Sequence, residues 1–234
     1  MTLRDFEQNM VRSGEKDFSA VDLSADKKRA LKLTPVSSEV AARLDRLVEL
    51  FLQRQQRMNL VARSTLPELW SRHVADSLQL IALAPSARIW IDLGTGGGFP
   101  GLVIACALSG QAGACVHLVE STMKKAMFLE QTARVLDLPV IVHPVRIEEF
   151  VTTFDEHADV VTARALAPLD KLLEVVAPLV KRGAKGLFLK GRDVEAELTE
   201  ATKCWTIQAA LVPSKTHPLA RVVVIHSAAR RSKQ

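Results

Sequence analysis

The sequence predicts an α/β fold in which a mostly parallel, seven-stranded sheet carries helices on both faces and a helical appendage precedes the sheet. Three observations lead to this prediction. Short apolar runs alternate with helical stretches over the C-terminal part of the chain, a glycine-rich turn follows the first such run, and only helical spacing precedes that turn. With 234 residues, of which 48% are hydrophobic, the chain can bury one core of moderate size.

We expect three parts along the chain. Residues 1–36 mix charges of both signs with few regularly spaced apolar groups, which predicts a flexible N-terminal extension. Residues 37–86 would form the helical appendage. Residues 87–234 would form the domain that is built around the sheet.

Two helices are expected in the appendage. The first begins with Ser37 or Ser38 as its N-cap and ends near Arg57, because apolar residues recur in it at spacings of three and four. The second runs from about residue 66 to residue 83, where the sequence APSA ends it. The apolar residues of the first helix are Val40, Leu44, Leu47, Val48 and Phe51.

The strands and helices of the main domain follow in alternation. The strand candidates, in chain order, are RIWIDLG, CVHLVE, PVIVHPV, ADVVTAR, KGLFLKG, CWTIQAAL and ARVVVIH. The helix candidates are residues 101–109, 122–136, 169–180 and 194–203. Because strand–helix–strand units give parallel neighbours, ligands are expected beyond the carboxyl ends of the strands. The last two strands have no helix between them, which predicts an antiparallel pair at one edge.

Composition argues against membrane, metal and disulfide chemistry. No stretch reaches the roughly 18 uninterrupted apolar residues of a membrane span, and the charged N-terminal segment lacks the apolar centre of a signal peptide, so we expect a cytoplasmic protein. Cys106, Cys115 and Cys204 show no CxxC spacing and lie on apolar segments, which predicts buried, reduced thiols. The six histidines have no metal-binding spacing. The net charge of +5 allows a polyanionic partner without identifying one.

The run IDLGTGGGFPG, residues 91–101, places five glycines between the first strand and a helix. Glycine permits positive φ angles and lets a ligand lie against the main chain. Gly96, Gly98 and Gly101 match the GxGxxG pattern of dinucleotide-binding proteins. The sequence therefore predicts a cofactor site at this turn.

Asp92 helps to distinguish two possible cofactors, NAD and S-adenosylmethionine. A carboxylate directly before the glycines would repel a pyrophosphate, whereas S-adenosylmethionine carries an ammonium and a sulfonium group at its amino acid end. The pattern D-x-G-x-G-x-G at Asp92, Gly94, Gly96 and Gly98 therefore favours S-adenosylmethionine over NAD. Glu120, at the end of the next strand, is expected to bind the ribose; the alternative is that it caps the following helix.

Several ordered motifs also carry a resemblance to a known family. They are NLVARST, RHVADS, IDLGTGGGFPG, VESTMKKAMFLE, RIEEF, TARA and LKG. Over about residues 44–226 the chain resembles the RsmG family, also called glucose-inhibited division protein B. The resemblance implies a Rossmann-like, S-adenosylmethionine-dependent methyltransferase that modifies N7 of one guanine in the decoding region of 16S ribosomal RNA. It also implies 16S RNA or the small ribosomal subunit as the partner, and we expect a monomer.

The resemblance assigns cofactor contacts to particular residues. These are Gly94 and Phe99 in the glycine-rich turn, Ile147 and Glu148 in RIEEF, and Arg164 in TARA. In this assignment Ile147 flanks the adenine from the end of the third strand.

The chemistry of guanine N7 requires no general base, because this nitrogen has a free lone pair and no proton to lose. We therefore expect positioning to suffice, and we name no catalytic residue. Three residues are candidates for facing the substrate, each with an alternative. Arg164 would contact guanine or a phosphate, or else pair with Glu148 or Asp159. Lys190 is a phosphate contact or a solvated charge, and His73 serves in packing or contacts the substrate.

Two other functions remain open from the sequence. One is a methyltransferase of the same fold that acts on a small molecule or a protein. The other is a nucleotide-binding assembly factor without catalysis.

Overall fold

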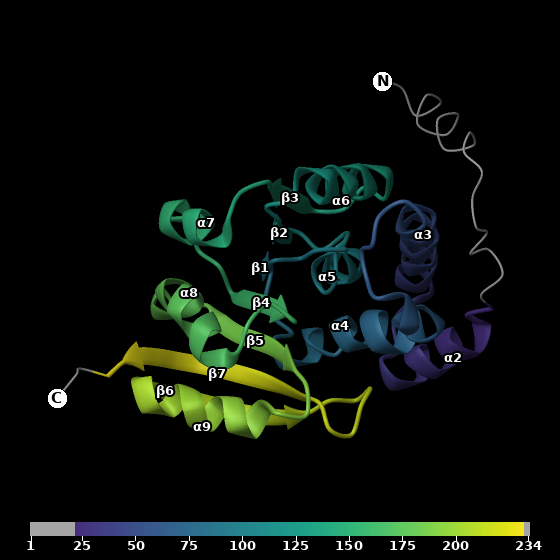
Figure 1. The fold of residues 1–234 in the computed structure, drawn as a ribbon. Coiled ribbons are helices and arrows are strands. Elements are labelled where there is room, and N and C mark those ends of the chain that lie inside the picture. The colour runs from purple at the N-terminus through teal and green to yellow at the C-terminus, as the bar shows by residue number, and fades with distance from the viewer. Residues whose placement is uncertain (1–21, 232–234) are drawn as a thin grey trace.

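The computed structural model describes residues 22–231 (Figure 1). Within this range the predicted α/β architecture is confirmed. One sheet has the strand order β3-β2-β1-β4-β5-β7-β6. Strands β1 to β5 are parallel, whereas β7 is antiparallel to β5 and to β6, as the short connection between the last two strands requires. The strands are β1 Ile89–Leu93, β2 Cys115–Val119, β3 Val140–His143, β4 Val160–Arg164, β5 Lys185–Lys190, β6 Trp205–Pro213 and β7 Arg221–Arg230.

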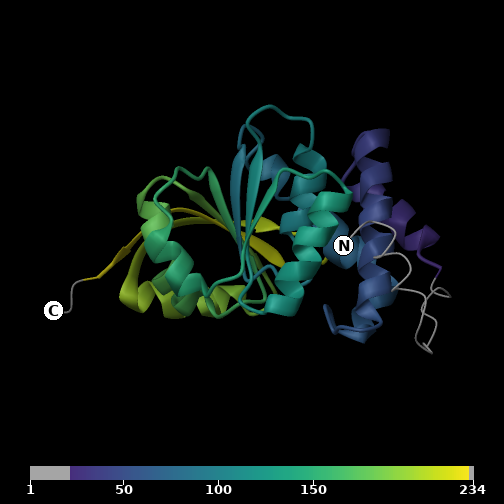
Figure 2. The same cartoon turned by 90° about the horizontal axis from the view of Figure 1, so that it is seen from above.

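Helices cover both faces of the sheet (Figure 2). The helices of the main domain are α5 Gly101–Leu108, α6 Met123–Val135, α7 Ile147–Thr153, α8 Leu169–Lys181 and α9 Val194–Cys204. One apolar core lies under α5, α6 and the appendage, and a second lies under α7, α8 and α9. Sequence analysis missed α7, because a helix of 7 residues is too short to show helical spacing.

Side chains of β1 alternate between the two cores. Trp90 packs in the core of the appendage side, and Ile91 and Leu93 pack in the opposite core. This alternation puts Asp92 on the same face as Trp90, where α5 begins. The position of Asp92 therefore follows directly from the register of the strand.

The first helix of the appendage is confirmed as α3, Ser38–Gln55. The Ser37 hydroxyl accepts a hydrogen bond from the amide of Val40 at 3.3 Å, which makes Ser37 the N-cap. Leu44, Leu47 and Phe51 are buried against the main domain, so the apolar stripe of α3 is what attaches the appendage to α5 and α6.

The second helix is not continuous. It is divided into a 3-10 turn (η1, Arg63–Glu68), a π-helical turn (η2, Trp70–Ala75), a short α4 (Asp76–Leu78) and a further 3-10 turn (η3, Ile81–Leu83). Pro67 lies inside η1 and cannot donate a backbone hydrogen bond. The amides of Trp70 and Ser71 donate to the Asp26 carboxylate at 2.8 and 3.2 Å, so a new helical segment begins there.

Asp26 belongs to a helix that the sequence did not predict. This helix, α2, spans Ser24–Leu33 and packs along η2, with Asp26 and Ala30 buried. The expectation of a flexible extension over residues 1–36 is therefore wrong for residues 24–33. Residues 1–21, to which the same expectation applied, lie outside the described range.

The cysteines only partly match the prediction. All three are free thiols, and burial raises the pKa of the Cys106 thiol to about 12. Cys115 is half-buried and Cys204 is exposed, so the prediction of buried thiols is wrong for Cys204. Cys204 is the last residue of α9. Across residues 22–231, no helix has both the length and the apolar character needed to cross a membrane.

Candidate cofactor and substrate site

The carboxyl ends of three parallel strands meet at one place. Leu93 of β1 pairs with Val119 of β2 on one side and with Ala163 of β4 on the other. The residues that follow these three, Gly94, Glu120 and Arg164, are therefore neighbours at the ligand-binding edge that parallel sheets share.

Asp92 joins the glycine-rich turn to the sheet. Its carboxylate is buried and accepts hydrogen bonds from the Gly101 amide and the Thr162 hydroxyl, each at 2.9 Å. Burial raises the pKa of this carboxyl to about 6, against the hydrogen bonds that favour the charged form. The described partners of Asp92 are protein groups, so its direct contact with a cationic ligand stays a prediction.

The glycines of the turn differ in what surrounds them: one is tightly packed and another has open space beside it. Gly94, Gly96 and Gly98 have positive φ angles of 66°, 57° and 92°. A side chain at Gly98 would lie 2.8 Å from Leu102 Cγ, so Gly98 is required for packing. At Gly96 the nearest atom to an added Cβ is the Gly94 carbonyl oxygen at 3.8 Å. The space beside Gly96 is thus open to a ligand.

Two apolar side chains flank Gly94. The position of a Cβ on Gly94 would be 2.8 Å from Leu166 Cδ1 and 3.6 Å from Ile147 Cδ1. Ile147 begins α7 and does not end the third strand, which corrects the expected placement although its side chain still reaches the turn. Leu166 was not predicted; it follows Ala165, whose φ of 51° is unusual for a residue with a side chain.

Glu120 connects the turn to α6. Its carboxylate accepts from the Gly96 amide at 3.1 Å and from the Thr122 amide at 2.7 Å, and the residue is buried. The second contact joins Glu120 to Thr122, the residue before α6, but α6 has no side-chain cap hydrogen bond, so the capping alternative does not describe Glu120. A carboxylate has capacity for further acceptor bonds, so the ribose contact stays a prediction.

Arg164 is held by the appendage. One guanidinium nitrogen donates to the Arg72 carbonyl oxygen at 3.3 Å, and another donates to Nδ1 of His73. Burial, together with Arg164 and Arg72, lowers the pKa of His73 to about 3, so the imidazole is neutral and can accept this bond. Neither Glu148 nor Asp159 is the partner of Arg164 among the described contacts.

His73 and Phe99 pack against each other, and neither faces open solvent. Their ring centroids are 5.2 Å apart, and Phe99 also packs on Phe51 of α3 at 5.1 Å. Nε2 of His73 lies 3.0 Å from the Thr65 hydroxyl. The packing alternative for His73 is therefore what the structure shows, and no ion pair joins Arg72 and Asp76 among the described contacts.

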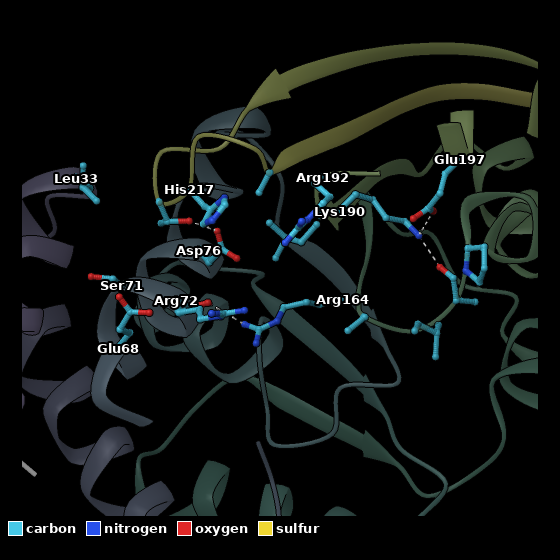
Figure 3. A pocket seen from close by; sticks show the side chains of 18 of the residues that line it. Leu33, Glu68, Ser71, Arg72, Asp76, Arg164, Lys190, Arg192, Glu197 and His217 are labelled. Atoms are coloured by element: carbon cyan, nitrogen blue, oxygen red, sulfur yellow. Dashed lines mark hydrogen bonds and ion pairs between the residues drawn. The ribbon is translucent and has the colours of Figure 1, made fainter. Parts of the chain in front are cut away.

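A cavity of about 700 Å³ opens on the other side of Arg164. It lies between α2, η1 and η2, and the loops that follow β4, β5 and β6 (Figure 3). Its basic lining residues are Arg29, Arg72, Arg164, Lys190 and Arg192.

The ammonium of Lys190 is 2.8 Å from the Glu197 carboxylate and is largely buried. Lys190 is thus not the solvated charge that was one alternative, and because it lines the cavity its contact with a phosphate stays a prediction. No group of described residues could hold a metal ion. Glu148 is exposed on α7.

Comparison with known proteins identifies relatives over most of the chain. A family model described as GidB, rRNA small subunit methyltransferase G, matches residues 40–222. A protein from Bradyrhizobium sp. strain BTAi1, named ribosomal RNA small subunit methyltransferase G, is 58% identical over 203 residues, which are 87% of this chain and 91% of that protein. A protein of the same name from Nitrobacter hamburgensis is 54% identical and covers 90% of this chain and 81% of its own length.

Among solved structures, an O-methyltransferase from Bacillus cereus in complex with SAH is similar in fold. The TM-score is 0.56 at 14% sequence identity, over 86% of this chain and 96% of that one. At this identity the likeness concerns the fold alone.

Proposed function

Because the chain belongs to the rRNA small subunit methyltransferase G family, we propose that it transfers the methyl group of S-adenosylmethionine to N7 of a guanine in the 16S RNA of the small ribosomal subunit. One observation carries this proposal: the glycine-rich turn and the basic cavity meet at Arg164. A cofactor on the turn and a base in the cavity would therefore both lie beside the Arg164 side chain.

The residues present fit the cofactor. Gly96 offers open main chain, and Ile147 provides an apolar side chain beside Gly94 where an adenine would lie. When bound, S-adenosylmethionine supplies a methyl group that bonds to N7 through the lone pair of that nitrogen, while the sulfur keeps the electron pair of the broken bond. The proposed cofactor residues are Asp92, Gly94, Gly96, Gly98, Phe99, Glu120, Ile147, Glu148 and Arg164.

These residues would contribute in different ways. Gly94, Gly96, Glu120 and Ile147 would contact the cofactor. Asp92, Gly98 and Phe99 would also hold the turn in shape, since Asp92 accepts from the Gly101 amide, Gly98 lies against Leu102 and Phe99 packs on Phe51. Glu148 would contribute from the first turn of α7.

Alignment of the two reactants is the protein's main task, because N7 loses no proton. His73 fits a positioning function, since a neutral imidazole can accept a hydrogen bond from Arg164. The Arg164 guanidinium would bond the base or a phosphate from the end of β4. No side chain of the protein has to accept a proton in this reaction.

The basic lining of the cavity suits RNA. Arg72 and Arg192 line it without an ion pair to a carboxylate among the described residues, so both can approach phosphates. Of the three functions open from the sequence, identities of 58% and 54% to proteins named for ribosomal RNA favour this one over a small-molecule or protein methyltransferase and over a non-catalytic factor. We further propose that the chain acts as a monomer in the cytoplasm.

Mass spectrometry of 16S RNA tests the proposal directly. In a strain that lacks the gene, fragments of 16S RNA are expected to lose one 7-methylguanosine, and expression of this chain is expected to restore it. Unchanged methylation in the deletion strain would contradict the proposal. Calorimetry with S-adenosylmethionine and NADH tests the cofactor separately, and heat is expected with the first ligand alone.

A further inference from the structure

We propose that Asp76 selects the target guanine by accepting hydrogen bonds from its N1–H and N2–H groups, and that its negative charge stabilises the base as N7 becomes methylated. The inference rests on the proposed function for the identity of the base. It adds a specificity residue on the substrate side.

The Asp76 carboxylate is held by one of its two oxygens. Oδ1 accepts hydrogen bonds from Gln79 Nε2 at 2.7 Å, from Thr216 Oγ1 at 2.5 Å and from Ser214 Oγ at 3.3 Å. Gln79 in turn accepts from the Lys215 amide at 2.9 Å. Oδ2 has no protein donor among residues 22–231, so the orientation of the carboxylate is set while one oxygen stays available.

The available oxygen belongs to the cavity. Asp76 is one of its lining residues, and Figure 3 shows the carboxylate among the side chains of Arg72, Arg192 and His217. The charge of Asp76 also reaches Arg164, because it acts against the burial that lowers the pKa of that guanidinium. Asp76 and Arg164 thus border the same space.

Asp76 differs from the other carboxylates of the cavity. Glu68 lies 3.4 Å from a guanidinium nitrogen of Arg29, and Glu197 lies 2.8 Å from the Lys190 ammonium. Within the described part of the chain, Asp76 is the lining carboxylate that has no ion pair. It is therefore the one able to offer its charge to a ligand.

Guanine suits this carboxylate better than adenine does. The N1–H and N2–H groups of guanine lie side by side and both donate, so the available Oδ2 can accept from both through its two lone pairs. Adenine has an acceptor at N1, and the lone pair would face the negative charge of Asp76. The neighbouring edge of guanine carries O6 and N7, both acceptors; O6 would then lie toward Arg164, while the N7 lone pair stays free for the methyl donor.

The same contact would also favour the reaction. As the bond to N7 forms, positive charge develops on the base, and the N1–H and N2–H groups become stronger donors. No proton leaves the base, and Asp76 stays ionised. Its attraction therefore grows between bound substrate and transition state, which is the kind of interaction that raises kcat.

The test compares guanosine with inosine, which lacks the N2 amino group. Small subunits are reconstituted with 16S RNA that carries either nucleoside at the methylated position. The wild-type chain is expected to lose about 10-fold in kcat/KM with inosine, since one hydrogen bond of the pair is gone. Asp76→Asn is expected to lose about 10- to 100-fold with guanosine, mostly in kcat, and to discriminate less than about 2-fold between the two nucleosides.

Asp45→Asn is the matched control, because Asp45 is an exposed appendage carboxylate outside the cavity. It is expected to keep the wild-type discrimination. Equal use of guanosine and inosine by the wild-type chain would overturn the inference without any variant. Undiminished discrimination by Asp76→Asn would also overturn it. Failure of the wild-type chain to methylate the guanosine substrate would instead contradict the proposed function.

Discussion

Arg164 owes its position to a residue from another part of the chain. His73 accepts its hydrogen bond from within η2, and the neutral imidazole is possible because burial lowers the pKa of His73 to about 3. Asp92 and Gly96 could be recognised from the sequence because they lie in one short glycine-rich run. Leu166 and Asp76 could not, because their contacts are with residues far away in the sequence.

Substitution of Gly96 by alanine tests the turn. Gly96 has a φ of 57°, so alanine is expected to reduce the free energy of unfolding by about 1 kcal/mol. It also puts a methyl group where a ligand would lie, so affinity for S-adenosylmethionine is expected to fall at least about 10-fold by calorimetry. Gly110→Ala is the control: Gly110 has a φ of 87° with open space around it, and only stability is expected to fall. Equal losses of affinity in both variants would contradict a cofactor site at Gly96.

The pH dependence of stability tests the environment of His73. Its folded pKa of about 3 lies below the ordinary 6.5, so the unfolded chain takes up a proton first as the pH falls. The contribution of the neutral His73 to the free energy of unfolding is therefore complete above pH 6.5 and declines as the pH falls toward 3. The decline is about 1 kcal/mol between pH 6.5 and 5.5. Asp92 acts in the opposite direction, because its raised pKa favours the folded state as the pH falls.

The comparison of the wild-type chain with His73→Gln isolates the His73 contribution, since Asp92, His117 and His143 remain in both. The difference in unfolding free energy between the two proteins is expected to shrink by about 1 kcal/mol from pH 6.5 to 5.5, measured by denaturant titration. A difference that stays constant with pH would show that His73 titrates normally in the folded state.

Among the elements, the strands and the first helix of the appendage followed the prediction, whereas the second helix of the appendage did not. Each strand is a local apolar run, and the parallel direction of β1 to β5 follows from their alternation with helices. The break before Trp70 depends on Asp26, a residue of α2 that lies 44 positions earlier. Such a contact leaves no local pattern, and neither does the short α7.

Docking of α2 can be measured through Asp26. Asp26→Ala removes the acceptor of two backbone amides and of the Ser71 hydroxyl, so the free energy of unfolding is expected to fall by about 2 kcal/mol. Asp45→Ala breaks only an exposed pair with Lys27 and is expected to cost less than about 0.5 kcal/mol. Equal costs in denaturant unfolding would mean that α2 does not stabilise the appendage.

For the whole molecule, the cavity is the feature that sequence analysis could not predict. Its walls come from segments between Arg29 and Ala220, and no single segment supplies more than five of the lining residues. The small net charge of +5 gave no indication that five basic side chains would gather there.

Salt dependence tests whether that cavity binds RNA. Arg192→Ala is expected to weaken binding to 16S RNA and to lower the slope of log affinity against log salt by about 1, because one phosphate contact is lost. Arg46→Ala serves as the control, since Arg46 pairs with Glu49 on α3 outside the cavity. Filter binding over a salt series measures both slopes, and an unchanged slope for Arg192→Ala would contradict the assignment.

The hydrogen bonds of Ser214 and Thr216 to Asp76 link positions that are 138 and 140 residues apart. During synthesis the appendage leaves the ribosome long before the final hairpin does. The glycine-rich turn could take up its shape beforehand, but the part of the cavity wall formed by Thr216, His217 and Ala220 is complete only when β6 and β7 have joined the sheet. An unfinished polypeptide therefore lacks a complete pocket for guanine, even if it already binds S-adenosylmethionine.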